Sequence, residues 1–249
     1  MINWLGRYYR VLAAVVLLAL LTTQIPARVV TGLLPGKVAL TGVTGTIWSG
    51  QAVRGWVLLD GKPLMLGRVQ WRFQAWRLGW STPLTVTSEW GDQILRARAG
   101  VGLSGRQSFR DVSVNIDTAI LRAMFPLYLE GTFSGNFARI ELANGKLSRA
   151  EGVGYLRGAI WTANSGDIPL GDYRIDMTGS AADAGVRGVV ETEGGALLLA
   201  GELNIFPDSY SVNLQGSGPV ARDDGFRRAV AMLATPSAEG FDIILQGQF

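Results

Sequence analysis

The sequence predicts a mainly β fold: an N-terminal transmembrane helix followed by a curved, mostly antiparallel, internally duplicated β-sheet domain with two short helices. Beyond residue 35, apolar residues recur at every second position in segment after segment, a period typical of strands with one buried face. The chain contains 33 glycines, which separate these segments. Glycine readily adopts the backbone angles of tight turns, so the spacing favours an antiparallel sheet.

The first element is an apolar run over residues 8–25. It is just long enough to span a membrane as a helix, which takes about 17 to 25 residues. Arg7 and Arg10 flank its start and Tyr8 and Tyr9 lie at its edge, a pattern typical of an uncleaved anchor with a cytoplasmic N-terminus. The residues predicted to form the membrane anchor are Val11, Leu12, Val15, Val16, Leu17, Leu18, Leu20 and Leu21.

A cleaved signal peptide is the alternative for this run. Cleavage needs small residues at positions −3 and −1, and before Arg28 these positions hold Ile25 and Ala27, which make a poor site. We therefore predict a cytoplasmic tip and a transmembrane anchor over residues 1–30. The β-domain over residues 31–249 is then expected on the other side of the membrane.

The strands that follow are predicted to share one apolar face. Val69, Trp71 and Phe73 alternate with polar residues, and a change of phase between Phe137 and Ile140 predicts a one-residue bulge near residues 135–139. The same alternation is found in these sets: Leu84, Val86 and Trp90; Leu95, Ala97, Ala99, Val101 and Leu103; Val112, Val114 and Ile116; Tyr210, Val212 and Leu214; Phe241, Ile243 and Leu245.

Two short helices are expected to interrupt the sheet, over residues 118–124 and 224–234. Asp117 can cap the first, and Asp223 or Asp224 the second. The second helix carries an apolar stripe that predicts a lid on the sheet. The stripe consists of Phe226, Ala229, Val230 and Leu233.

The most distinctive stretch is a motif in which two glycines bracket a short β-type run. The order glycine, small residue, isoleucine, tryptophan, hydroxyl returns at residues 158–162, which predicts two duplicated halves at about residues 36–125 and 126–249. Trp48 and Trp161 are expected to be mostly buried in equivalent strands; the alternative is that one is exposed as a docking anchor. The motif residues are Gly45, Thr46, Ile47, Trp48, Ser49 and Gly50.

The composition argues against an enzyme. The chain has no Cys and no His, which removes thiol and Ser-His nucleophiles and the usual zinc and haem ligands. The three lysines, Lys37, Lys62 and Lys146, form no Ser-x-x-Lys motif, and no pair of carboxylates marks a site. We expect no catalytic residue, no cofactor and no metal.

The charge balance does not predict a nucleic-acid surface. The formal net charge is +3, from 23 basic and 20 acidic residues. Arg7, Arg10 and Arg28 flank the apolar run, so 20 basic residues in the rest of the chain face 20 acidic ones. No cluster of Lys and Arg marks a nucleic-acid-binding element.

The motif lies in a segment, residues 34–52, that resembles the region just after the membrane anchor in type II secretion system protein N. Residues 66–73, 170–173 and 194–203 add matches in the same order. The resemblance implies an inner-membrane-anchored periplasmic component that assists assembly or coupling of the secretion apparatus. Other secretion-system subunits and the inner membrane are then the expected partners.

Two further interpretations remain open. An anchor followed by long β-segments is similar to the AsmA-like envelope proteins, which implies a lipid or other hydrophobe in a β-groove. The aromatic C-terminus, residues 243–249, resembles the last strand of an outer-membrane barrel. Against the barrel, few segments reach the roughly nine to eleven alternations that a spanning strand needs.

Overall fold

The computed structural model describes residues 17, 20–34, 36–59, 62–77, 82–102, 105–118, 129–163, 166–180, 185–231 and 233–248. Within them, fifteen strands form one antiparallel sheet, so the predicted fold class is confirmed in its β part. The strands are β1 Val38–Thr41, β2 Thr44–Gly45, β3 Ser49–Leu59, β4 Lys62–Phe73, β5 Leu84–Trp90, β6 Gln93–Val101, β7 Gln107–Asp117, β8 Leu129–Ala143, β9 Lys146–Ala163, β10 Gly166–Ser180, β11 Gly185–Gly195, β12 Leu198–Ile205, β13 Ser209–Ser217, β14 Thr235–Pro236 and β15 Gly240–Gln248.

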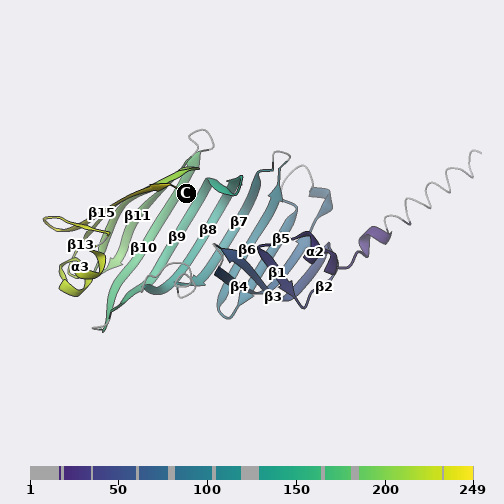
Figure 1. The fold of residues 1–249 in the computed structure, drawn as a ribbon, viewed down its shortest axis with the longest axis horizontal. Coiled ribbons are helices and arrows are strands. Elements are labelled where there is room, and N and C mark those ends of the chain that lie inside the picture. The colour runs from purple at the N-terminus through teal and green to yellow at the C-terminus, as the bar shows by residue number, and fades with distance from the viewer. Residues whose placement is uncertain are drawn as a thin grey trace, which may run out of the picture.

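The sheet is a meander in which nearly every strand pairs with its neighbours in sequence (Figure 1). The order runs from β1 through β3 to β13 and then to β15 and β14, while β2 pairs with β3. Two-residue turns make this possible, as between β8 and β9, where Asn144 and Gly145 have φ angles of 53° and 79°. Positive φ at both positions is the geometry that joins twisted antiparallel strands.

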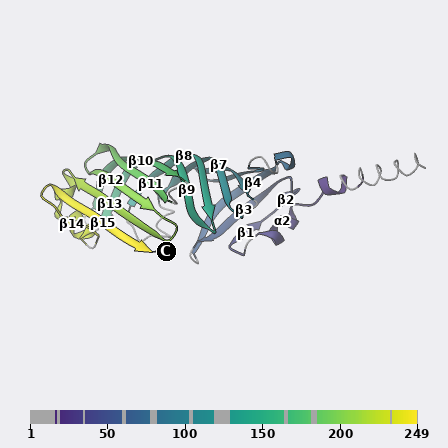
Figure 2. The same ribbon diagram turned by 90° about the horizontal axis from the view of Figure 1, so that it is seen from above.

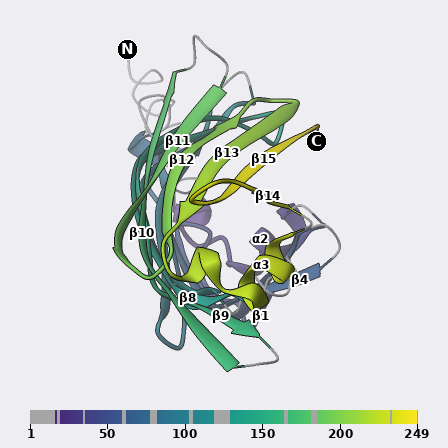
Figure 3. The same cartoon turned by 90° about the vertical axis from the view of Figure 1, so that its left-hand side faces the viewer.

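The sheet curves into a trough, seen from above in Figure 2 and along its length in Figure 3. Bulges contribute to this shape, because an extra residue bends a strand and increases its twist. The bulge predicted for β8 is confirmed: β8 and β9 change register between Phe137 and Arg139. On the neighbouring β7, Asp111 adopts a φ of 47°.

Apolar residues line the inner face of the trough in three clusters. Helix α3 lies inside the curve at the C-terminal end (Figure 3), and the middle cluster consists entirely of strand residues. The buried members are Ala27, Ala52, Val69 and Trp71 at the N-terminal end; Ala97, Val112 and Phe137 in the middle; and Ala159, Leu170, Tyr173, Leu197, Val220, Ala221, Phe226 and Phe241 at the C-terminal end.

The predicted second helix is α3, Asp224–Val230. The side chain of Asp223 caps it by accepting a 2.7 Å hydrogen bond from the Phe226 N–H. The helix ends four residues earlier than expected, because the N–H groups of Leu233 and Ala234 both turn back to the Val230 carbonyl. Leu233 is therefore 49% exposed, and its assignment to the apolar stripe was wrong.

Phe226 and Val230 of that stripe close the C-terminal end of the trough as predicted. Phe226 is buried and its ring contacts Trp161 and Phe241, with centroids 5.9 Å away in each case. Val230 packs against the same cluster. A 3-10 turn, η3 Val220–Arg222, leads into α3 and buries Val220.

The other predicted helix, residues 118–124, lies outside the described residues except for Thr118. The Thr118 hydroxyl is buried between the carbonyl oxygens of Leu129 and Gly131, at 3.1 and 3.0 Å. Two short elements were not predicted: helix α2, Arg28–Leu33, and the 3-10 turn η1, Ala75–Arg77.

Part of the predicted anchor is described. Residues 20–23 are helical, and Leu17, Leu20 and Leu21 are exposed. In the described part of the chain, no helix combines the length and the apolar character needed to cross a membrane. The other predicted anchor residues lie outside the described residues: Val11, Leu12, Val15, Val16 and Leu18.

Two residues assigned to the inner face are exposed instead. Trp90 is 45% exposed because it ends β5 beside the tight turn at Gly91, and Val101 is 73% exposed at the last position of β6. Both lie at strand ends, where the sheet does not enclose them. Leu103, from the same predicted set, lies outside the described residues.

Candidate functional site

The glycine-bracketed motif forms a tight hairpin between β2 and β3. The Thr46 N–H donates to the Ser49 carbonyl at 2.9 Å, and the Ser49 N–H donates to the Thr46 hydroxyl at 3.2 Å. Gly45 has a φ of 93°, and a Cβ there would lie 2.5 Å from the Ser49 carbonyl oxygen. A side chain at Gly45 would therefore open this turn.

Trp48 fixes the hairpin to its surroundings through three contacts. Its carbonyl accepts a 2.6 Å hydrogen bond from the Phe73 N–H of β4, and its ring lies 5.6 Å from the Phe73 ring. The indole N–H donates to the Thr22 carbonyl at 2.7 Å. The tryptophan thus joins a strand of the sheet to the segment that precedes the domain.

The same hairpin holds that preceding segment along its length. The Ile47 N–H donates to the Ile25 carbonyl at 3.1 Å, and the Ala27 N–H donates to the Gly45 carbonyl at 3.0 Å. Ala27 is 1% exposed in the N-terminal apolar cluster. We call residues 22–27 the linker, and the hairpin clamps it to the sheet.

Gly50 makes room for the core beneath the clamp. A Cβ at Gly50 would lie 2.4 Å from the Trp71 ring and 2.8 Å from the Thr44 carbonyl oxygen. Trp71 is 8% exposed and packs in the cluster that contains Ala27. The second motif glycine therefore allows this large ring to pack against the hairpin backbone.

The structure corrects the expectation that Trp48 and Trp161 occupy equivalent strands. Both are half-buried; Trp48 lies in the turn before β3, whereas Trp161 lies near the end of β9 and contacts Phe226 of α3 edge-on. The two residues share a sequence pattern but have different partners. Trp48 contacts the linker, and Trp161 contacts the C-terminal lid.

A polar depression of about 580 Å³ opens beside the clamp on the outer face of the sheet. Gly45, Ser49 and Gly50 of the motif border it, so the hairpin forms one of its walls. The other walls come from β4, β5 and β6. Its lining residues are Thr44, Gly45, Ser49, Gly50, Gln51, Gln70, Trp71, Arg72, Gln74, Thr85, Thr87 and Arg96.

Ionisable groups in the described residues form no metal-binding cluster of three or more His, Cys, Asp or Glu side chains.

Burial raises the pKa of the Tyr173 phenol well above its ordinary value, and the nearby Asp172 adds to the shift. The Tyr173 hydroxyl donates a 2.9 Å hydrogen bond to the Leu197 carbonyl. This arrangement keeps the phenol neutral, which suits a structural role.

The structure shows a role for the motif that the sequence patterns do not reveal. Alternation and glycine spacing indicate a hairpin at residues 45–50, but no pattern shows that its partner is a segment twenty or more residues earlier. The polar depression was likewise missed, because Arg72 and Arg96 are ordinary outward-facing strand residues in the sequence. Only the register of β4, β5 and β6 brings them to one place.

Comparisons with a family model and with a curated relative point to the same protein family. A family model described as type II secretion system (T2SS), protein N, matches residues 36–243, which include the hairpin of the clamp, the depression and most of the sheet. The chain is 27% identical over 245 residues to the type II secretion system protein N of Aeromonas hydrophila, covering 93% of this chain and 94% of that relative. No solved structure matches the chain. The chain therefore belongs to the type II secretion system protein N family.

Proposed function

We propose that this chain is an inner-membrane-anchored component of the type II secretion system whose β-sheet domain lies in the periplasm and assists assembly or coupling of the apparatus. Family membership supports the secretion role. The Arg-flanked apolar run at the N-terminus supports the topology. Other secretion-system subunits are then its partners.

The clamp is the observation that carries a coupling role. Linker residues 22–27 comprise the last residues of the apolar run and the two residues after it, and two backbone hydrogen bonds from the hairpin, together with the Trp48 indole, tie them to the sheet. A flexible linker would let the domain turn independently of the anchor. A clamped linker holds the domain at a fixed orientation to the membrane, as a positioning subunit requires.

Reporter fusions test the topology. Alkaline phosphatase fused after Phe249 is expected to be active and green fluorescent protein at the same point dark. Mature protein that begins near Arg28 would show that the run is a cleaved signal and would contradict the anchor. Crosslinking in cells, followed by purification of the full chain in detergent, is expected to recover other secretion-system proteins.

A second function, binding of a lipid or other hydrophobe, is favoured by the middle of the trough. None of the described helices packs on the cluster around Phe137, and the apolar inner face continues from it toward both ends. This face offers few hydrogen-bonding groups, so a hydrocarbon chain suits it better than a peptide. The two functions are compatible, because the inner face would bind the hydrophobe while the rest of the domain contacts other subunits.

Native mass spectrometry of the full chain distinguishes these functions. Phospholipid retained at a fixed stoichiometry after detergent exchange would support hydrophobe binding. The matched variants are Val114→Asp on the inner face, which is expected to lose the lipid, and Ser113→Asp on the outer face, which is expected to keep it. Lipid bound equally by both variants would contradict a site in the trough.

A further inference from the structure

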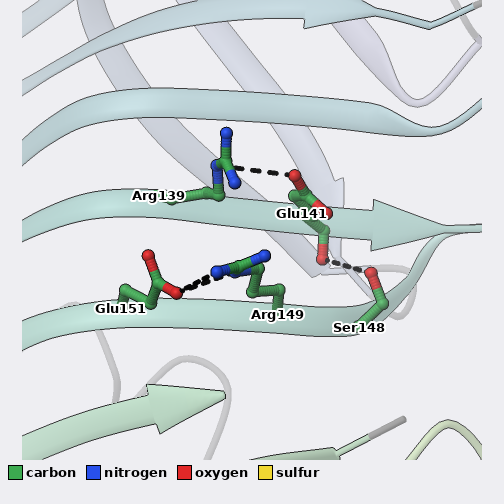
Figure 4. A network of polar contacts seen from close by, with 5 residues as sticks. All are labelled: Arg139, Glu141, Ser148, Arg149 and Glu151. Carbon is green, nitrogen blue, oxygen red and sulfur yellow. Dashed lines mark hydrogen bonds and ion pairs between the residues drawn. The ribbon is translucent and has the colours of Figure 1, made fainter. Parts of the chain in front are cut away.

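The outer face of the sheet carries its charges unevenly. Residues 129–248 contain nine basic and fifteen acidic residues, whereas residues 36–117 contain ten basic and five acidic. In the C-terminal part, arginines on the strands form ion pairs: Arg139 with Glu141, Arg149 with Glu151, Arg157 with Glu193, Arg174 with Asp176, and Arg187 with Glu202. Figure 4 shows two of these pairs side by side on β8 and β9.

Two arginines beside the clamp lack such partners. Among the described residues, neither Arg72 nor Arg96 forms an ion pair or a side-chain hydrogen bond, and both are exposed. The neighbouring Arg98 is different, because it is paired with Asp111. Arg72 and Arg96 therefore place uncompensated positive charge beside the clamp.

The register of three strands brings these arginines together around two threonines. Arg72 of β4 lies opposite Thr85 of β5, and Thr87 of β5 lies opposite Arg96 of β6. Neighbouring strands lie about 4.8 Å apart, and Thr85 and Thr87 are two residues apart along β5, so the two arginines start roughly 12 Å from each other across β5. Their long side chains can both reach a group placed over the threonines.

Every polar side chain that borders this depression is a donor or a neutral group. Arg72 and Arg96 supply guanidinium donors, Thr85 and Thr87 hydroxyls, and Gln70 an amide; no acidic residue is among the lining residues that the structure describes. Guanidinium groups match the oxygens of phosphate with paired hydrogen bonds. Such a set suits an anion with several oxygens.

The size of the depression indicates more than a bare ion. Its volume of about 580 Å³ lies within the range of small-molecule sites, about 300 to 1,000 Å³. We propose that Arg72 and Arg96 form a binding site for a phosphate group carried on a small polar molecule, of the kind found in a phospholipid headgroup. The lipid source rests on the proposed membrane topology, because the clamp would then hold this site near the anchor.

Calorimetry on the full chain in dodecyl maltoside at 0.15 M salt tests the site, with glycerol 1-phosphate as the first probe. We expect saturable binding that weakens at least tenfold in Arg72→Gln/Arg96→Gln. Arg222→Gln/Arg227→Gln, which removes the same charge from exposed positions at the other end of the sheet, is expected to bind like the wild type. Circular dichroism checks that each variant is folded.

The source of the phosphate is tested with further probes. Micelles doped with phosphatidylglycerol, and with diacylglycerol as the phosphate-free control, report on a lipid headgroup; inorganic phosphate reports on the free ion. Tighter binding of phosphatidylglycerol assigns the site to lipid, and preference for inorganic phosphate assigns it to a soluble ligand. Absence of binding by all phosphate probes, or equal binding by Arg72→Gln/Arg96→Gln, would overturn the site. Neither result depends on the membrane topology or on secretion. The phosphate site can therefore fail while the proposed function stands, and the proposed function can fail while the site stands.

Discussion

At the scale of single residues, Trp48 has the clearest testable role. Trp48→Phe keeps an aromatic ring beside Phe73 but removes the 2.7 Å hydrogen bond to the Thr22 carbonyl. Loss of one such bond costs about 1 kcal/mol. We therefore expect the two amides that join linker and hairpin, Ala27 and Ile47, to exchange hydrogen about fivefold faster in the detergent-solubilised full chain.

Trp76→Phe is the control for this change, because Trp76 is 77% exposed in η1. It is expected to leave linker exchange unchanged. Linker protection that persists in Trp48→Phe would show that the backbone bonds hold the linker without the indole. A stable Trp48→Phe protein that no longer recruits secretion-system subunits would instead make Trp48 a docking residue.

Tyr173 gives a second residue-scale prediction, and it depends on pH. Tyr173→Phe leaves the Leu197 carbonyl without its hydroxyl donor, which is expected to lower the free energy of unfolding by about 1 to 3 kcal/mol near neutral pH. The folded-state pKa of Tyr173 is raised, so the wild-type phenol stays neutral when folded and ionises above pH 10 when unfolded.

Because the phenol ionises only when the protein is unfolded, ionisation favours unfolding. The contribution of Tyr173 to the free energy of unfolding is therefore fully present below about pH 10 and is lost as the pH rises further. Between pH 10 and 11 the wild type should lose about 1 kcal/mol relative to Tyr173→Phe. Urea unfolding at both pH values measures this difference. If the difference in free energy of unfolding between the wild type and Tyr173→Phe does not decrease from pH 10 to pH 11, the phenol is not held neutral.

At the scale of elements, the lid helix α3 depends on its N-cap. Asp223→Ala removes the acceptor of the Phe226 N–H and is expected to cost about 1 kcal/mol. Asp224→Ala removes the same charge without a cap bond and should cost less. Because Phe226 packs on Trp161 and Phe241, unfolding of α3 should expose apolar area, detectable as a gain in binding of a hydrophobic dye. Equal stability of the two variants would contradict the cap.

Sequence patterns predicted individual elements well where the signal is local. The alternation of Val69, Trp71 and Phe73, the bulge beside Phe137 and the cap at Asp223 all depend on neighbours within a few residues. Predictions failed where long-range packing decides. The end of α3 was placed too late because Leu233 continues the 3.6-residue period, although the chain has already turned at Val230.

The candidate site was only half predictable for the same reason. The motif indicated a hairpin, and its resemblance to a known family was correct. The linker that the hairpin holds, and the meeting of Arg72 with Arg96 across β5, depend on tertiary structure and register. A repeated Gly-x-Ile-Trp pattern even suggested equivalent strands, although the partners of Trp48 and Trp161 differ.

At the scale of the whole molecule, the sheet separates its roles by face and by end. The inner face is apolar and is closed by the linker at one end and by α3 at the other. The outer face is polar, with paired charges toward the C-terminal end and unpaired arginines near the clamp. This separation supports the proposal of a subunit that is anchored at one end and contacts its partners along its length.

Secretion in cells tests the central claim most directly. The gene is deleted, and secreted enzymes are measured in the medium and in the periplasm, with the wild-type chain and Trp76→Phe as complementing controls. The account predicts that deletion traps these enzymes in the periplasm and that both controls restore their release. Normal secretion without the gene, under conditions where the rest of the apparatus is made, would contradict the assignment to a working part of the type II secretion system.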